Sequence, residues 1–176
     1  MISTSAIRRE SAIPVQFDDF FRTEYPRLVP MVHALLGDRG RAEDVAQEAL
    51  AAAQQVWPTV SRYERPGAWV RRVALNRASN VRRRRGREVV ALRRMDAAAG
   101  RVEDPPVEGD ERLWRHVREL PEQQRFAVVL YYVEDRSVAE VADILQCSEG
   151  SVKTHLSRAR AALAQALGGS GEEEMS

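Results

Sequence analysis

The stretch LPEQQRFAVVLYYVEDRSVAEVADILQCSEGSVKTHLSRARAAL (residues 120–163) decides the fold, because its apolar residues recur at helical spacing and short polar segments separate them. Ser137 and Glu140 have the spacing of a capping box, which predicts that a helix begins there. We expect one helix over 137–146 and a second over 149–167, joined by about three residues. Two short helices joined by such a turn are typical of a helix-turn-helix.

The second helix of this pair is expected to begin after Ser148 as its N-cap and to bury one apolar stripe. Its opposite side combines small hydroxyls, which permit close approach to a major groove, with basic groups that reach phosphates or guanine edges. The candidate DNA-reading residues there are Ser151, Lys153, Thr154, Ser157, Arg158 and Arg160. A helical hairpin with a merely solvated polar face would show the same pattern.

Further helices are expected immediately upstream of this pair. Pro121 stands where the first residue of a helix is predicted. A core stripe follows it at Phe126, Val129, Leu130 and Val133. Residues 111–167 therefore read as a unit of four short helices.

The first part of the chain also shows helical periodicity. Three helices are expected, over about 17–36, 41–57 and 67–85. Pro26 and Pro30 predict a kink or a break in the first of them. Pro58 is expected to end the second helix, and Thr59–Pro66 reads as a loop.

A change of composition separates the two helical parts. The segment 86–110 has no sustained apolar face, is rich in acids and contains Pro105-Pro106, which is typical of a linker. The sequence therefore predicts an all-α protein of two small helical domains joined by a flexible acidic linker. The expected boundaries are a disordered N-terminus over 1–15, a first domain over 16–88, the linker over 89–110, a second domain over 111–167, and a disordered acidic tail over 168–176.

Charge is strongly segregated along the 176 residues, although Lys+Arg is 27 and Asp+Glu is 26. Residues 71–94 contain ten Arg and one Glu, a local charge of +9, whereas 95–111 contain six acids and one Arg, a local charge of −5. Because only Glu88 lies near these arginines in the sequence, we expect that they cannot all pair within the chain. A nucleic-acid backbone is the natural partner of such a patch, with strongly salt-dependent binding. A solvated basic face is the alternative.

Several functional classes are excluded by the residues that are present. The single Cys147 excludes an internal disulfide framework and a Cys-based zinc site. His33, His116 and His155 lack metal-ligand spacing, and the sequence motifs of phosphate-binding loops and hydrolases are missing. No apolar run reaches membrane-spanning length, and the N-terminus lacks the apolar core of a secretory signal. We expect a cytoplasmic, non-enzymatic protein without cofactor, metal or small-molecule substrate, in which Cys147 packs in a turn; a thiol switch is the alternative for that residue.

An acidic face is expected on the second helix. Asp44, Gln47 and Glu48 are spaced i, i+3, i+4 and so lie on one side, opposite Val45 and Ala49. Such a face could dock on a basic partner or simply be solvated.

The order of these parts resembles the extracytoplasmic-function (ECF) sigma factors of bacterial RNA polymerase, of the sigma-70 superfamily and actinobacterial-like. DVAQEAL (44–50), WVRRVALNRASNVRRRR (69–85), the acidic linker and the stretch 120–163 carry the resemblance, which covers about residues 16–167. It implies a promoter-specificity subunit that binds core polymerase, recognises the −35 and −10 promoter elements and promotes DNA melting. No fused regulatory domain is expected after residue 167.

The resemblance also implies roles for individual residues. Asp44, Gln47 and Glu48 match the DxxQE pattern of region 2.2, which binds the clamp helices of the polymerase; the flap is the further contact. The helix-turn-helix resembles region 4.2, which reads the −35 element in the major groove. The residues implied in −10 binding are Tyr63, Trp69, Arg71, Arg72, Asn76, Arg77, Asn80, Arg82, Arg83 and Arg84.

Partners and competing functions complete the expectations. The implied partners are core RNA polymerase, promoter DNA and an anti-sigma factor, with no membrane. The main alternative is an autonomous helix-turn-helix regulator that binds operator DNA as a dimer, and it would leave the acidic face without a role. A third possibility is an interaction protein whose arginines bind RNA or an acidic partner.

Overall fold

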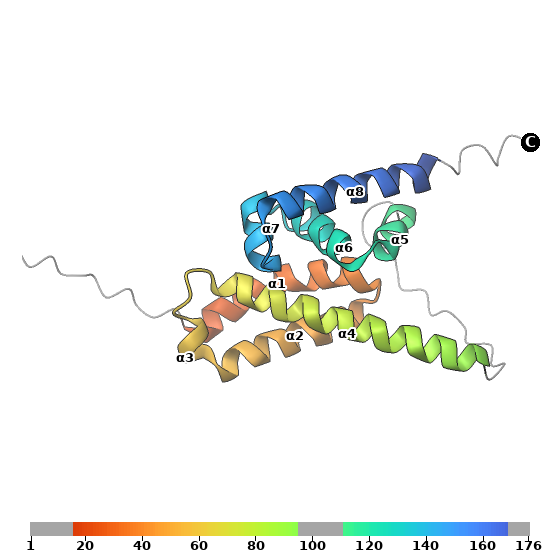
Figure 1. The fold of residues 1–176 in the computed structure, drawn as a ribbon. Coiled ribbons are helices and arrows are strands. Elements are labelled where there is room, and N and C mark those ends of the chain that lie inside the picture. Colours follow the sequence, from red (N-terminus) through yellow and green to blue (C-terminus); the bar gives the residue numbers. More distant parts are fainter. Residues whose placement is uncertain (1–15, 95–110, 169–176) are drawn as a thin grey trace, which may run out of the picture.

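The computed structural model describes residues 16–94 and 111–168, and all regular structure in these two ranges is helical. The expected all-α class is confirmed. The elements, shown in Figure 1, are α1 (Phe17–Leu36), α2 (Arg39–Gln55), α3 (Trp57–Val60), α4 (Pro66–Arg94), α5 (Glu111–Glu119), α6 (Glu122–Val128), the π-helix η1 (Val129–Val133), α7 (Val138–Leu145) and α8 (Glu149–Gly168). The predictions of disorder at both ends, and most of the predicted linker, fall outside the described residues.

We call α1–α4 the N-terminal unit and α5–α8 the C-terminal unit. In the N-terminal unit, α1 packs on α2 and α4, and α2 packs on α4, around a buried stripe that includes Leu28, Leu50 and Val70. In the C-terminal unit, α8 packs on α5, α6 and α7. Among the described helices, none combines the length and apolar character that crossing a bilayer requires.

A kink or a break was predicted in α1, and the break is wrong, because the helix runs uninterrupted through Pro26 and Pro30. Each proline removes one backbone donor from the helical ladder, a local cost that packing can offset. Leu28 and Met31, both fully buried, continue the inward stripe across the two prolines.

The third helix is longer than predicted, because α4 continues from Pro66 to Arg94. The segment 86–94 was expected to begin the linker, but it consists mostly of good helix formers such as Arg, Glu, Ala and Leu. Gly86 adds only a small penalty there. The acidic and proline-rich residues that suggested a linker come later in the chain.

Two short elements also differ from expectation. Pro58 was expected to end the second helix, but α2 ends at Gln55, and Pro58 lies near the start of α3, where a missing backbone donor costs nothing. The predicted loop Thr59–Pro66 is therefore helical at Thr59 and Val60. Residues 129–133 form the π-helix η1, which extends α6 by wider turns. The periodicity of the sequence did not distinguish this π-helix from an α-helix.

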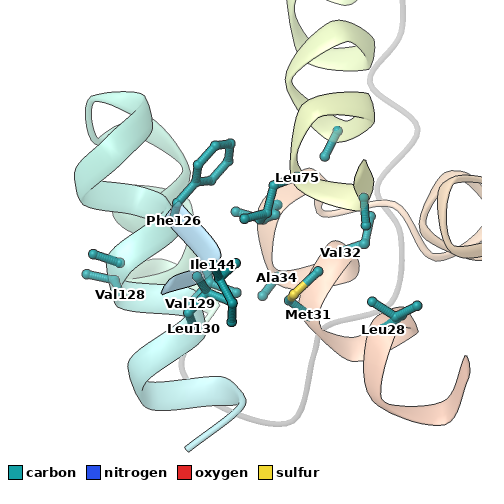
Figure 2. Close-up of a cluster of buried hydrophobic side chains, with 14 of the residues drawn as sticks. Leu28, Met31, Val32, Ala34, Leu75, Phe126, Val128, Val129, Leu130 and Ile144 are labelled. Atoms are coloured by element: carbon teal, nitrogen blue, oxygen red, sulfur yellow. The ribbon is translucent and has the colours of Figure 1, made fainter. Parts of the chain in front are cut away.

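The two units share one hydrophobic core. Figure 2 shows Met31 and Ala34 of α1 and Leu75 of α4 on one side, with Leu130 and Ile144 on the other. α1 packs against η1 and α5, and α4 packs against α7. The C-terminal unit therefore lies directly on the N-terminal unit.

The predicted capping box at the start of α7 is confirmed. The Ser137 N–H donates to Glu140 Oε2 at 2.9 Å, and the Glu140 N–H donates to Ser137 Oγ at 3.3 Å. The hydrogen bond from the Ser137 backbone, the bond from its hydroxyl and the Arg136 guanidinium lower the pKa of Glu140 to about 2. The ionised carboxylate is therefore part of the folded structure of the helix-turn-helix.

The capping box predicts a pH-dependent cost for Glu140→Gln, which keeps an acceptor but removes the charge. Because the folded-state pKa is lowered, the stabilisation by the carboxylate is complete above the ordinary value of 4.5 and is lost as the pH falls toward about 2. Urea unfolding should show the variant less stable at neutral pH, with the difference shrinking across that acidic range. A difference that stays constant with pH would contradict the assignment.

Candidate nucleic-acid and protein interfaces

The outward face of α8 carries the residues that were predicted to read DNA. Val152, Leu156 and Ala159 are buried against the rest of the C-terminal unit. Five of the six predicted residues are exposed on the other side: Lys153, Thr154, Ser157, Arg158 and Arg160.

The sixth residue, Ser151, is half-buried and belongs to the start of the helix. Its N–H donates to Ser148 Oγ at 3.0 Å, and the two hydroxyls lie 2.9 Å apart. Ser148 is therefore the N-cap, as predicted. Thr154 also forms a hydrogen bond within the helix, because its hydroxyl donates to the Gly150 carbonyl at 2.9 Å.

The acidic face of α2 is exposed at all three predicted positions, Asp44, Gln47 and Glu48. Glu48 also accepts a hydrogen bond from Arg77 of α4, with Nη1 and Oε2 at 2.6 Å. The Glu48 side chain is 59% exposed and the Arg77 side chain 39% exposed. Asp44 and Glu48 of the acidic face therefore adjoin arginines of α4, and together these residues line one open groove.

Apart from Trp69, the predicted −10 residues of α4 divide into two groups by exposure. The first group is open to solvent. Asn76, Asn80, Arg83 and Arg84 are exposed, and Arg77 is half-exposed. Within this group Arg83 Nη2 donates to Asn80 Oδ1 at 3.0 Å.

The second group faces the C-terminal unit and consists of Arg71, Arg72 and Arg82. Arg71 is only 2% exposed, and its guanidinium pairs with Glu24 of α1 at 2.6 Å and with Glu134, which follows η1. Only Glu88 was expected as a nearby carboxylate, but Arg71 pairs with two others. Its partners are far away in sequence, so a search among neighbouring residues could not find them.

The other two members of this group bind backbone carbonyls. Arg72 donates from Nε to the Ile144 carbonyl at 3.1 Å and from Nη2 to the Asp143 carbonyl at 3.2 Å. Arg82 donates to the Leu35 carbonyl at 3.2 Å and, through Nη2, to the C-terminal unit.

Arg82 joins the ends of two helices, one from each unit. Its second acceptor is the Arg118 carbonyl at 2.6 Å, near the end of α5, whereas Leu35 lies near the end of α1. Unpaired carbonyls at helix C-termini attract cations. Burial lowers the pKa of Arg82, and the neighbouring Arg118 and Arg85 guanidinium groups lower it further.

Tyr63 and Trp69 lie together at a cavity of about 560 Å³ beside the start of α4. Tyr63 is 45% exposed, and Trp69 is half-buried against the core. Arg65 and Asp143 line the same cavity, although neither was among the predicted site residues. Asp143 comes from α7, so sequence reasoning had no signal to place it there.

Within residues 16–94 and 111–168, no group of three His, Cys, Asp or Glu side chains is arranged to hold a metal ion. Cys147 is half-buried, and burial raises the pKa of its thiol. A reactive cysteine needs a lowered pKa, so this position is a poor nucleophile.

Comparisons with known proteins find a matching family model for each of the two units. The family model described as Sigma-70 region 2 matches residues 20–88, and that described as Sigma-70, region 4 matches residues 110–163. The RNA polymerase sigma-E factor of Streptomyces antibioticus is 32% identical over 155 residues, which are 87% of this chain and 85% of that protein. The ECF RNA polymerase sigma factor SigM of Mycobacterium tuberculosis H37Rv is 29% identical over 86% of this chain and 77% of its own length.

Two solved structures share the fold. The sigma factor RpoE of Bartonella quintana, in complex with the anti-sigma factor NepR, has a TM-score of 0.69 at 24% identity, covering 86% of this chain and 96% of that one. CnrH, in complex with the cytosolic domain of CnrY, has a TM-score of 0.62 at 21% identity, covering 87% and 88%.

Proposed function

The chain belongs to the ECF sigma factors, non-catalytic subunits of RNA polymerase that recognise promoters for transcription initiation, and from this premise we propose which surface performs each task. The N-terminal unit corresponds to region 2 and the C-terminal unit to region 4. The observation that best supports the assignment is that five of the six residues predicted to read DNA on α8, and all three predicted to bind polymerase on α2, are exposed.

The outward face of α8 is proposed to read the −35 element. Its five exposed residues lie opposite the buried stripe, so the helix can enter a major groove without disturbing the core. Lys153, Arg158 and Arg160 provide positive charge for phosphates and guanine edges. Thr154 and Ser157 have small side chains, which let the helix approach the bases closely.

The N-terminal unit is proposed to bind the −10 element and stabilise its melted form. Tyr63 and Trp69 offer aromatic surface beside a cavity large enough for an unstacked base. Arg72 of α4 and Arg65, which precedes the helix, line the same cavity. The exposed group on α4, from Asn76 to Arg84, would hold the backbone, and its charge makes this binding salt-dependent.

Asp44, Gln47 and Glu48 are proposed to bind the polymerase clamp helices, with the flap as the partner of the C-terminal unit. We also propose an anti-sigma factor as a partner, because RpoE and CnrH were solved with NepR and CnrY. A cytoplasmic location follows from the proposed partnership with polymerase.

The experiment that tests this function combines core-polymerase pull-down with run-off transcription from a promoter library, with and without the chain. Stable binding to core and new, sequence-selective start sites are expected. Specific binding to duplex DNA together with no binding to core would instead favour an autonomous regulator.

Arg158→Ala tests the −35 assignment. If Arg158 reads a base, binding to the selected promoter should weaken by about 1–3 kcal/mol, with relaxed preference at one position. Binding measured across a panel of single-base promoter variants gives both quantities. Arg115→Ala, which removes an exposed arginine from α5 of the same unit, is the matched control. A loss that is equal for all sequences would assign Arg158 to a phosphate contact.

A further inference from the structure

A groove between α4 and α5 has no part in the functions assigned so far. Its volume is about 390 Å³, which lies within the range of small-ligand sites. Side chains from both units line it, and we call it the arginine groove after five of them: Arg41 of α2, Arg82 and Arg85 of α4, and Arg115 and Arg118 of α5.

The positive charge of the arginine groove is only partly neutralised. Arg85 and Arg115 are exposed, and neither has an ion-pair partner among the described residues. Glu119 is the single acid among the side chains that line the groove. Its carboxylate is 69% exposed and lies 3.4 Å from His116 Nδ1. The groove therefore attracts anions.

Arg118 presents a fixed guanidinium at the groove. It packs on Gly37, since a Cβ at Gly37 would lie 3.0 Å from Arg118 Cζ, and it pairs with Glu111. Its Nη1 atom is buried and has no hydrogen-bond partner within residues 16–94 and 111–168. Because buried donors in folded proteins are nearly always paired, this unused donor indicates that an acceptor from outside the chain fits here.

The arginines of the groove also repel one another. Burial lowers the pKa of Arg82, and the neighbouring Arg118 and Arg85 guanidinium groups lower it further. An anion placed among these groups would offset their repulsion. Guanidinium groups pair with phosphate oxygens through two parallel hydrogen bonds, so phosphate suits them particularly well.

The arginine groove has an apolar side as well. Leu36, Val81 and Val89 line it, and Val89 is 38% exposed. Val89 and Gly86 belong to the part of α4 that the sequence had assigned to the linker, so this wall exists because the helix continues. A ligand with a flat apolar group beside its charges would use both sides.

We propose that the arginine groove binds a compact oligophosphate, with its phosphates on Arg85, Arg115 and Arg118. A chain of linked phosphates can reach arginines on two different helices, whereas a single phosphate cannot engage them all. In a nucleoside triphosphate, the base covers the apolar side. Because the lining side chains come from both units, the site is complete only while the units are packed, and a bound ligand holds α4 and α5 together.

The test is isothermal titration calorimetry on the full chain at low ionic strength, where charge attraction is least screened. The probes are sodium tripolyphosphate, ATP and inorganic phosphate. We expect a single site for tripolyphosphate and for ATP, and much weaker binding of inorganic phosphate. Tighter binding of ATP would identify a nucleotide as the ligand, and equal affinities would identify the phosphate chain alone; both support the proposal.

Two kinds of variant locate the site. Arg85→Ala combined with Arg115→Ala removes two exposed cations and should raise the Kd by at least about tenfold. Gly86→Phe leaves the charge unchanged and places a ring beside the groove. A Cβ at Gly86 meets no other atom within 4 Å, so the helix can accept the larger side chain. This variant should also weaken binding.

Each variant has a matched control. Arg87→Ala combined with Arg112→Ala removes the same charge from the same two helices but outside the groove, and Gly86→Ala adds only a methyl group. Both controls should bind like the parent chain, and circular dichroism checks that every variant is folded.

Absence of tripolyphosphate and ATP binding to the parent chain would overturn the proposal. Equal binding by Gly86→Phe and Gly86→Ala, or by the two double variants, would also overturn it, because the basic surface as a whole would then attract the anion. Oligophosphate binding needs neither polymerase nor promoter DNA. Its failure would therefore leave the proposed promoter function intact.

Discussion

Asp44→Arg combined with Glu48→Arg should abolish binding to core polymerase while the fold is retained. Both side chains are exposed on α2 and neither contributes to the core, so the helix should tolerate the change. At a polymerase interface two carboxylates would become two repelling cations, and breaking close charge pairs costs about 2–5 kcal/mol each. We therefore expect the Kd for core to rise by at least about a hundredfold.

Asp18→Arg is the control for this double variant. Asp18 is an exposed carboxylate in the first turn of α1, outside the proposed docking face on α2. Binding measured by surface plasmon resonance on immobilised core should be close to that of the parent chain. Retained binding by the double variant would remove the acidic face from the polymerase interface.

Leu130→Ala should cause the largest loss of stability. Leu130 is fully buried in the core cluster shared by the two units, and Figure 2 shows it on the side facing Met31 of α1. Removing a buried leucine side chain costs about 2–5 kcal/mol, which combines lost burial with the cavity left behind. Urea unfolding followed by circular dichroism should show the transition at clearly lower denaturant concentration.

Tyr132→Ala is the comparison for this change, since it lies two residues further along η1 and is 53% exposed. It loses a T-shaped contact with Tyr131, whose ring centroid is 4.9 Å away, so its cost should stay below about 1 kcal/mol. Equal destabilisation by the two variants would contradict the placement of Leu130 in the shared core.

The local features of the fold were predictable because their causes are local. The capping box at Ser137 and the N-cap at Ser148 each depend on residues three positions apart, and both were predicted and found. The exposed face of α8 likewise follows from helical periodicity. For the same reason α2 presents Asp44, Gln47 and Glu48 together.

The features that sequence reasoning missed depend on residues far apart in the sequence, or on physical effects that oppose each other at one place. Arg71 finds its second carboxylate at Glu134, 63 positions later in the chain, and the packing of the C-terminal unit on α1 and α4 brings the two residues together. In α1, the packing of buried residues offsets the hydrogen bonds that the two prolines remove, so the helix is uninterrupted. In α4, the helix-forming residues of 86–94 continue the helix beyond the end of its apolar stripe.

The ion pair between Arg77 and Glu48 has a consequence for the order of assembly. If Glu48 is engaged by polymerase, Arg77 loses its partner and becomes available to DNA, so the two ligands are thermodynamically linked. Linkage is reciprocal, so DNA held by Arg77 must strengthen polymerase binding by the same factor. An exposed pair contributes at most about 1 kcal/mol, which limits this cooperativity to about fivefold. The ion pair between Arg77 and Glu48 in the free subunit can thus make the binding of polymerase and the binding of promoter DNA favour each other.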